Sequence, residues 1–295
     1  MMRKKFKCAV AALLALTLVA GGMLISKDGV IISKAANVEN SNEDVENKEE
    51  PDEDKEKACT DESKTLSEDT SGEQTAAEVI DSGTCGKDGD NLTWVLTSDG
   101  TLTISGTGEM TSVSPWNNNS DIVKVKIEEG VTSIGDSAFS QFSSLEEITI
   151  PDSMISIEDW AFGNCSSLTS IHIPENVIKI GKGAFYFCSN LSSVTIPEGV
   201  THIEDNTFWK CSSLTSISMP ESVTRIGEGV FYACSSLTDI NIPENVTSIG
   251  SRAFENCSNL VSISMPERIV TIGDGAFRFC SNLMNVSIPE SITEI

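Results

Sequence analysis

The sequence predicts a β-rich solenoid, in which short coils stack on one another around a shared apolar interior. The main observation is a period of 23 residues without insertion or deletion, kept by separate columns of phenylalanine, leucine, proline and isoleucine. A fixed period of this length is typical of repeat architectures, because one unit cannot bury its own apolar face and needs a neighbour to cover it. The phenylalanine column, which we expect in the core, consists of Phe139, Phe162, Phe185, Phe208, Phe231, Phe254 and Phe277.

Each unit reads roughly L-x-x-I-x-I-P-E-x-V-T-x-I-G-x-x-A-F-x-x-C-S-S/N. Apolar and polar residues alternate from Leu145 to Ile150, which predicts a strand that Pro151 ends. The V-T-x-I-G piece predicts a second short extended segment. In A-F-x-x-C, Phe and Cys stand three residues apart and would share one face of a helical or 3₁₀ turn. One coil therefore contains short strands and a helical or 3₁₀ turn.

A cap is predicted in front of the regular repeats. Two alternating runs, L-T-W-V-L and T-L-T-I, flank an Asp-Gly pair, which indicates a β-hairpin. Trp116 lies 23 residues before Phe139 and indicates a degenerate first coil. We assign residues 84–126 to the β-hairpin cap and this degenerate coil, and residues 127–295 to the repeats. The last repeat is incomplete, so we expect either an open edge at Ile295 or a longer parent protein.

The N-terminal part predicts export. A basic start is followed by the apolar run Cys8–Ile25, so residues 1–35 resemble a signal peptide. An uncleaved membrane anchor is the alternative, because this run is just long enough to span a bilayer. Residues 36–83 are acidic and poor in large apolar side chains, which predicts a disordered linker. The folded part would then be secreted or displayed at the cell surface.

Charge and composition exclude several functions. A net charge of −24 is incompatible with general nucleic-acid binding, because the phosphate backbone attracts cationic surfaces. The two histidines, His172 and His202, stand in different columns, and no serine or cysteine column converges with either one. The carboxylates that follow each proline form a line rather than the convergent set that calcium needs. We therefore predict a non-enzyme without cofactor or metal.

A second column consists of cysteines. Its position is occupied by Phe142 in the first full repeat, so the site favours an apolar body, and we expect buried free thiols. Disulfides between adjacent coils, or a metal, are the alternatives. The column contains Cys165, Cys188, Cys211, Cys234, Cys257 and Cys280.

Two columns depart from the repeat in the same three coils and form a candidate ligand patch. Aromatic and basic side chains together are typical of recognition surfaces. The alternative is an aromatic ladder that stabilises its own stack, with the basic residues offsetting acids such as Glu204. A polar strand face rich in Ser, Thr and Asn, around Ser193 and Ser216, is a second candidate. The patch residues are Tyr186, Trp209 and Tyr232, and Lys179, His202 and Arg225.

The repeat unit resembles the 23-residue leucine-rich repeat of BspA-like bacterial surface proteins, over about residues 127–295. The S-G-T-C-G and L-T-W-V-L stretches resemble the lead-in that often precedes such repeats. The resemblance implies a leucine-rich-repeat solenoid and adhesion to an extracellular protein or glycan, but no binding residues can be carried over. A passive structural spacer, or a fragment of a larger surface protein, is the alternative. The oligomeric state stays open.

Overall fold

The computed structural model describes residues 23–25, 31–33, 77–112, 114–116 and 119–294. The predicted linker up to residue 76 and most of the predicted signal peptide lie outside these residues. Within the latter, β1 (Met23–Ile25) and β2 (Ile31–Ser33) pair antiparallel. In the described segments, no helix has the length and apolar character needed to cross a membrane.

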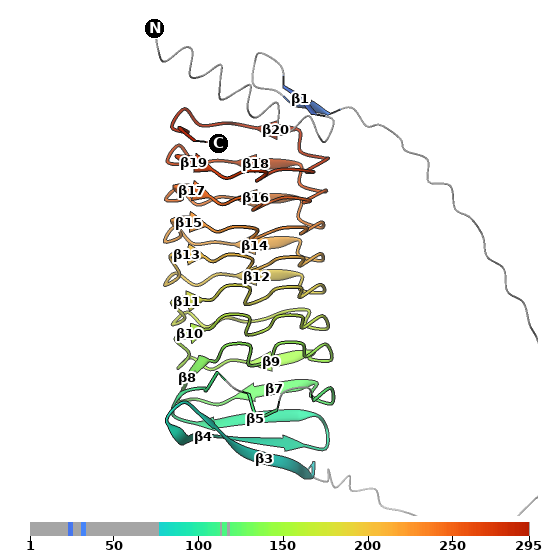
Figure 1. Cartoon of the computed structure of the whole chain (residues 1–295), viewed down its shortest axis with the longest axis vertical. Helices are drawn as coiled ribbons and strands as arrows, with labels where there is room; N and C mark the ends of the chain where they lie inside the picture. Colours follow the sequence, from blue (N-terminus) through green and yellow to red (C-terminus); the bar gives the residue numbers. More distant parts are fainter. Residues whose placement is uncertain (1–22, 26–30, 34–76, 113, 117–118, 295) are drawn as a thin grey trace, which may run out of the picture. The chain divides into compact units, whose positions relative to one another are not determined.

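Residues 124–294 form a stack of coils with two columns of short parallel strands (Figure 1). Partners in neighbouring coils are 23 residues apart, as in Ser193 beside Ser216 and Ser156 beside Lys179. The solenoid prediction is thus confirmed. The first column contains β7 (Lys124–Ile127), β9 (Glu147–Thr149), β12 (Ser193–Thr195), β14 (Ser216–Ser218), β16 (Asp239–Asn241), β18 (Ser262–Ser264) and β20 (Asn285–Val286). The second contains β8 (Val131–Ile134), β10 (Ser156–Ile157), β11 (Lys179–Ile180), β13 (His202–Ile203), β15 (Arg225–Ile226), β17 (Ser248–Ile249) and β19 (Thr271–Ile272).

The cap is an antiparallel sheet that continues into the first column. Its strands are β3 (Val79–Gly86), β4 (Gly89–Thr97) and β5 (Thr101–Gly106), and β5 then pairs parallel with β7. A short strand, β6 (Gly108–Glu109), pairs with β8 and starts the second column.

The predicted hairpin is present, since β4 and β5 are joined by a turn that contains Gly100, with φ of 77°. β3 begins at Val79, inside the linker of residues 36–83 that the sequence predicts. The β3 backbone pairs with β4, with Gly83 beside Trp94. The sequence of β3 alternates little between apolar and polar residues, so only this long-range pairing reveals the strand.

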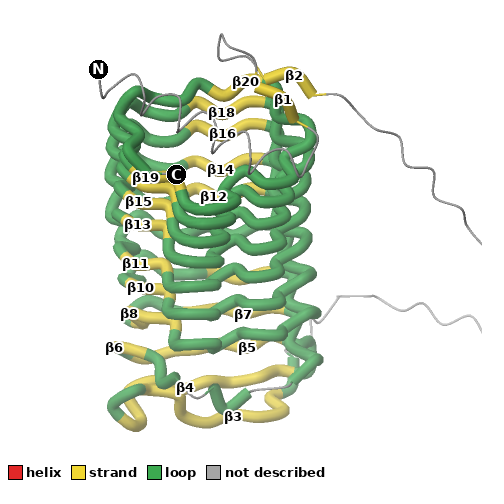
Figure 2. Tube along the Cα trace, turned by 45° about the horizontal axis from the view of Figure 1, so that its top comes forward, coloured by secondary structure: helices red, strands yellow, loops and turns green. Residues whose placement is uncertain are grey.

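The turn after the second strand differs from the sequence prediction. No helix occurs in the described part of the chain, and loops connect the strands of each coil (Figure 2). The residues two before and two after each buried phenylalanine have positive φ, for example 59° at Asn206 and 57° at Lys210. A left-handed residue every four positions interrupts a right-handed helix. The Phe208 N–H consequently donates to Val230 O in the next coil, whereas the Trp209 N–H donates to Asn206 O.

The core is a continuous column of stacked rings. The seven repeat phenylalanines are buried, and adjacent rings have centroids 5.2–5.8 Å apart and planes within 19° of parallel. Trp116 extends the column, 5.8 Å from Phe139, and its indole N–H donates to Ala138 O. The degenerate first coil therefore packs in register with the repeats.

Candidate ligand-binding surface

The aromatic residues of the candidate patch form one outer stack. Tyr186 and Trp209 have ring centroids 6.2 Å apart, and Trp209 and Tyr232 have centroids 3.8 Å apart with planes 8° from parallel. All three side chains are partly exposed. The two tyrosines are the only ones in the chain, so this type of side chain is confined to the stack.

The turn geometry explains how these rings reach the surface. Each follows a buried phenylalanine and donates its N–H to the residue three positions earlier, at 2.9 Å for Tyr186 and 3.1 Å for Trp209. The preceding phenylalanine thus points inward and the aromatic residue outward. The Trp209 ring also lies against Gly229, where an added Cβ would come within 2.6 Å of the indole. Because residue 229 is a glycine, no side chain occupies the space that the Trp209 ring fills.

Two further aromatic residues, which the sequence prediction did not include, belong to the same surface. Trp160 is 39% exposed and meets Tyr186 edge-on, with centroids 5.1 Å apart. Phe187 is 38% exposed, and the Lys210 ammonium lies 5.3 Å from its ring centroid. Trp160 replaces residues such as Gly183 in its column, and this large change was the signal available in the sequence.

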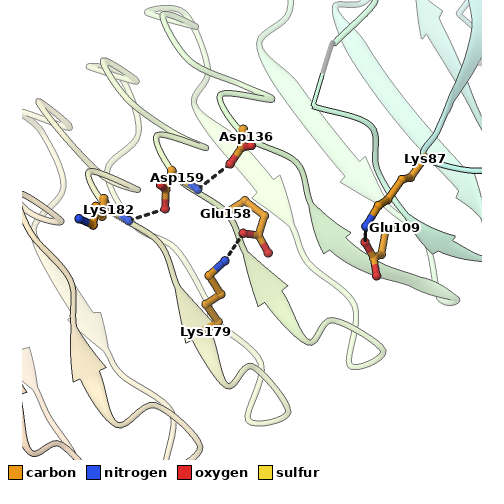
Figure 3. Close-up of polar contacts among 7 residues, drawn as sticks. All are labelled: Lys87, Glu109, Asp136, Glu158, Asp159, Lys179 and Lys182. Atoms are coloured by element: carbon orange, nitrogen blue, oxygen red, sulfur yellow. Dashed lines mark hydrogen bonds and ion pairs between the residues drawn. The ribbon is translucent and has the colours of Figure 1, made fainter.

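The basic residues of the candidate patch lie on the second strand column and contact carboxylates. Lys179 pairs with Glu158, and this hydrogen bond raises the pKa of the lysine (Figure 3). The Arg225 guanidinium lies 3.7 Å from an Asp205 carboxylate oxygen. His202 Nδ1 lies 2.9 Å from the Thr201 hydroxyl.

No ion pair, hydrogen bond or ring contact among the described residues joins these three basic residues to the aromatic stack. The structure therefore brings the aromatic half of the patch together and places the basic half in a separate network.

A line of carboxylates runs beside this network. Asp136 accepts a hydrogen bond from the Asp159 N–H, and Asp159 accepts one from the Lys182 N–H at 2.9 Å (Figure 3). Asp205 accepts in the same way from Glu228. Burial raises the pKa of Asp205, but the Glu228 N–H and the nearby cations outweigh it and lower the pKa overall. These carboxylates cap the backbone of the next coil.

The six repeat cysteines lie inside the stack as free thiols. Each sulfur donates to the phenylalanine carbonyl of the preceding coil, for example Cys211 Sγ to Phe185 O at 3.1 Å. Burial raises the pKa of Cys188 to about 12, so the thiol stays protonated at neutral pH. No cluster of three or more potential metal ligands occurs in the described residues.

Comparisons with known proteins identify the repeat. A model of the BspA-type leucine-rich repeat region matches six copies, over residues 116–225 and 201–295. A search of curated proteins gave no match.

Several solved structures resemble the chain. A leucine-rich repeat protein from Bacteroides ovatus is 28% identical, with a TM-score of 0.31, over 55% of this chain and only 59% of its own. The leucine-rich repeat protein of T. pallidum is 26% identical, with a TM-score of 0.42, over 65% of this chain and 88% of its own. A leucine-rich cell surface protein from Faecalibacterium prausnitzii is 23% identical, with a TM-score of 0.33, over 70% of this chain and 95% of its own.

Proposed function

The chain belongs to the BspA-type leucine-rich repeat family, and we propose that it is a non-enzymatic, secreted or cell-surface interaction protein. Its solenoid would bind an extracellular protein or glycan. The basic and apolar N-terminal sequence supports export.

The observation that carries this proposal is the outer aromatic stack. Trp160 and Phe187 are more than a third exposed, beside the partly exposed Tyr186, Trp209 and Tyr232. Core packing does not account for these rings, because the inner phenylalanine column already fills the core of every repeat. Exposed aromatic groups gathered in one area are typical of interaction sites.

A binding screen with the purified chain tests the proposal. The targets are extracellular-matrix proteins, mucins and a glycan array, and the variant is Tyr186→Ser/Trp209→Ser/Tyr232→Ser. A matched control, Thr195→Ala/Ser218→Ala/Ser264→Ala, changes three exposed side chains on the first strand column. Circular dichroism establishes that both variants are folded.

Binding lost in the aromatic variant and kept in the control would support the proposed site. Binding lost only in the strand variant would move the site to the polar strand face. The absence of binding to every target would contradict the proposal and favour a spacer.

A further inference from the structure

We propose that the outer turns of the solenoid bind an acidic polypeptide. This inference rests on the proposed function and names its ligand class. We define the turn face as the outward side chains of seven equivalent segments that surround the buried phenylalanines. These segments are residues 137–144, 160–167, 183–190, 206–213, 229–236, 252–259 and 275–282.

The charge of these segments favours an acidic ligand. The chain carries 44 acidic residues, yet Glu255 is the only one in these seven segments, which also contain Lys210, Arg252 and Arg278. Glu255 is buried, 3.7 Å from Arg252 and 3.9 Å from Arg278, so two cations neutralise its charge. These seven segments are thus net positive on a strongly acidic protein, although an acidic residue directly precedes five of them: Asp136, Asp159, Asp205, Glu228 and Asp274.

The orientation of the aromatic rings also favours an acidic ligand. The two faces of Trp209 meet Tyr186 and Tyr232, so solvent reaches mainly the ring edge. Aromatic edges carry partial positive charge, and tyrosine and tryptophan bear hydroxyl and N–H donors there. An exposed edge of this kind favours carboxylate and carbonyl oxygens. Sugar rings, by contrast, stack their C–H groups on open aromatic faces.

The composition of the turn face favours a polypeptide over an anionic glycan. Apart from its inward residues, the turn face is mostly serine, asparagine, glycine and aromatic residues, with a few cations. Antibody combining sites have a similar composition, because rigid aromatic rings and small polar groups suit protein surfaces. Trp160 and Phe187 add exposed apolar area that could pack against side chains of the partner.

Lys210 is the cation on this face that is most available to a ligand, because Arg252 and Arg278 pair with Glu255. Lys210 is exposed above Phe187, and the Arg278 guanidinium lies 4.6 Å from the Phe279 ring centroid. At physiological salt, charges more than about 8 Å away are largely screened. An acidic group seated over Phe187 would therefore interact with Lys210 more strongly than with carboxylates beyond that distance.

The test uses the full chain at physiological salt and a random copolymer of glutamate and tyrosine as the probe. Wild type is compared with Lys210→Gln and Lys210→Glu, which remove and reverse one charge on the turn face. Lys126→Glu is the matched control for Lys210→Glu, since it makes the same charge reversal at an exposed lysine of β7. Heparin and a lysine–tyrosine copolymer are the competing probes.

We expect the glutamate–tyrosine copolymer to bind wild type, with Kd raised about tenfold by Lys210→Glu, less by Lys210→Gln, and little changed by Lys126→Glu. An equal effect of Lys126→Glu would reduce the interaction to net charge and overturn the proposal. Binding of heparin or of the lysine–tyrosine copolymer in place of the glutamate–tyrosine copolymer would overturn the ligand class. Failure of the glutamate–tyrosine copolymer to bind would overturn it as well. If the copolymer does not bind but a target of the binding screen does, the interaction function stands and only the acidic ligand class is wrong. Failure of the ligand class is therefore distinguishable from failure of the proposed function.

Discussion

Trp209 and Tyr232 lie face to face on the outside of the solenoid, with ring centroids 3.8 Å apart. Tyr186 lies on the other side of Trp209, at 6.2 Å. The three rings thus combine two roles that the sequence left as alternatives, since they support one another and still present their edges to solvent.

The Trp209–Tyr232 contact should stabilise the fold measurably. A double-mutant cycle with Trp209→Ala and Tyr232→Ala should give a coupling of about 0.5–1.5 kcal/mol in urea unfolding. The same cycle on Tyr186 and Trp209 should give a smaller coupling, because their centroids are farther apart. Equal couplings would contradict the geometry.

The inner phenylalanine column should be far more sensitive than the outer rings. Phe208→Ala removes a buried ring between Phe185 and Phe231 and should cost about 3–5 kcal/mol of unfolding free energy. Phe187→Ala removes a partly exposed ring and serves as the control. A Tm that Phe208→Ala left unchanged would disprove the inward position of this column.

The thiol column should make stability depend on alkaline pH. Burial raises the pKa of Cys188 and Cys280 from 9.0 to about 12. Because the unfolded state loses these protons first, their contribution is complete below pH 9 and declines as pH rises toward 12. Urea unfolding from pH 7 to 10.5 should show this decline, and Cys188→Ala should reduce its slope.

Native thiols should also resist alkylation. Iodoacetamide at pH 8 should leave all six repeat cysteines unmodified until denaturant is added, because the thiolate is the reactive form and is disfavoured by burial. Mass spectrometry counts the modified sites. Rapid labelling of Cys211 in the native protein would contradict its buried position.

The left-handed turn positions should tolerate glycine. Ala233 has φ of 56°, a conformation that costs L-residues about 1–2 kcal/mol, so Ala233→Gly should be neutral or stabilising by up to about 1 kcal/mol. Ala253→Gly is the control, because it removes a buried methyl group and should destabilise. Thermal unfolding measures both, and equal losses would argue against strain at Ala233.

The repeat period was enough to predict the solenoid and its inner column, because Phe139 and its equivalents recur without a single shift. The turn conformation was not predictable, since residues as different as Trp160, Arg252 and Gly275 all adopt the same positive φ. Hydrogen bonds between coils impose it, whatever the residue type. The helical expectation failed because it considered one coil in isolation.

The candidate site was predictable in part. Tyr186, Trp209 and Tyr232 stood out because they break their column, and stacking in register brings such residues together. The role of Lys179 was not predictable in this way, because Glu158 reaches it from another column of the preceding coil. Ion pairs between different columns depend on side-chain reach, which the period alone does not specify.

Each repeat thiol donates to a carbonyl of the preceding coil, as Cys234 does to Phe208 at 3.1 Å. During synthesis from the N-terminus, a new coil would find this acceptor already in place on the coil made before it. The Phe208 N–H, by contrast, would find its acceptor, Val230 O, only when the following coil is made. Each coil is thus bonded in both directions, so a stack cut at any point leaves unpaired thiols on one side and unpaired N–H groups on the other.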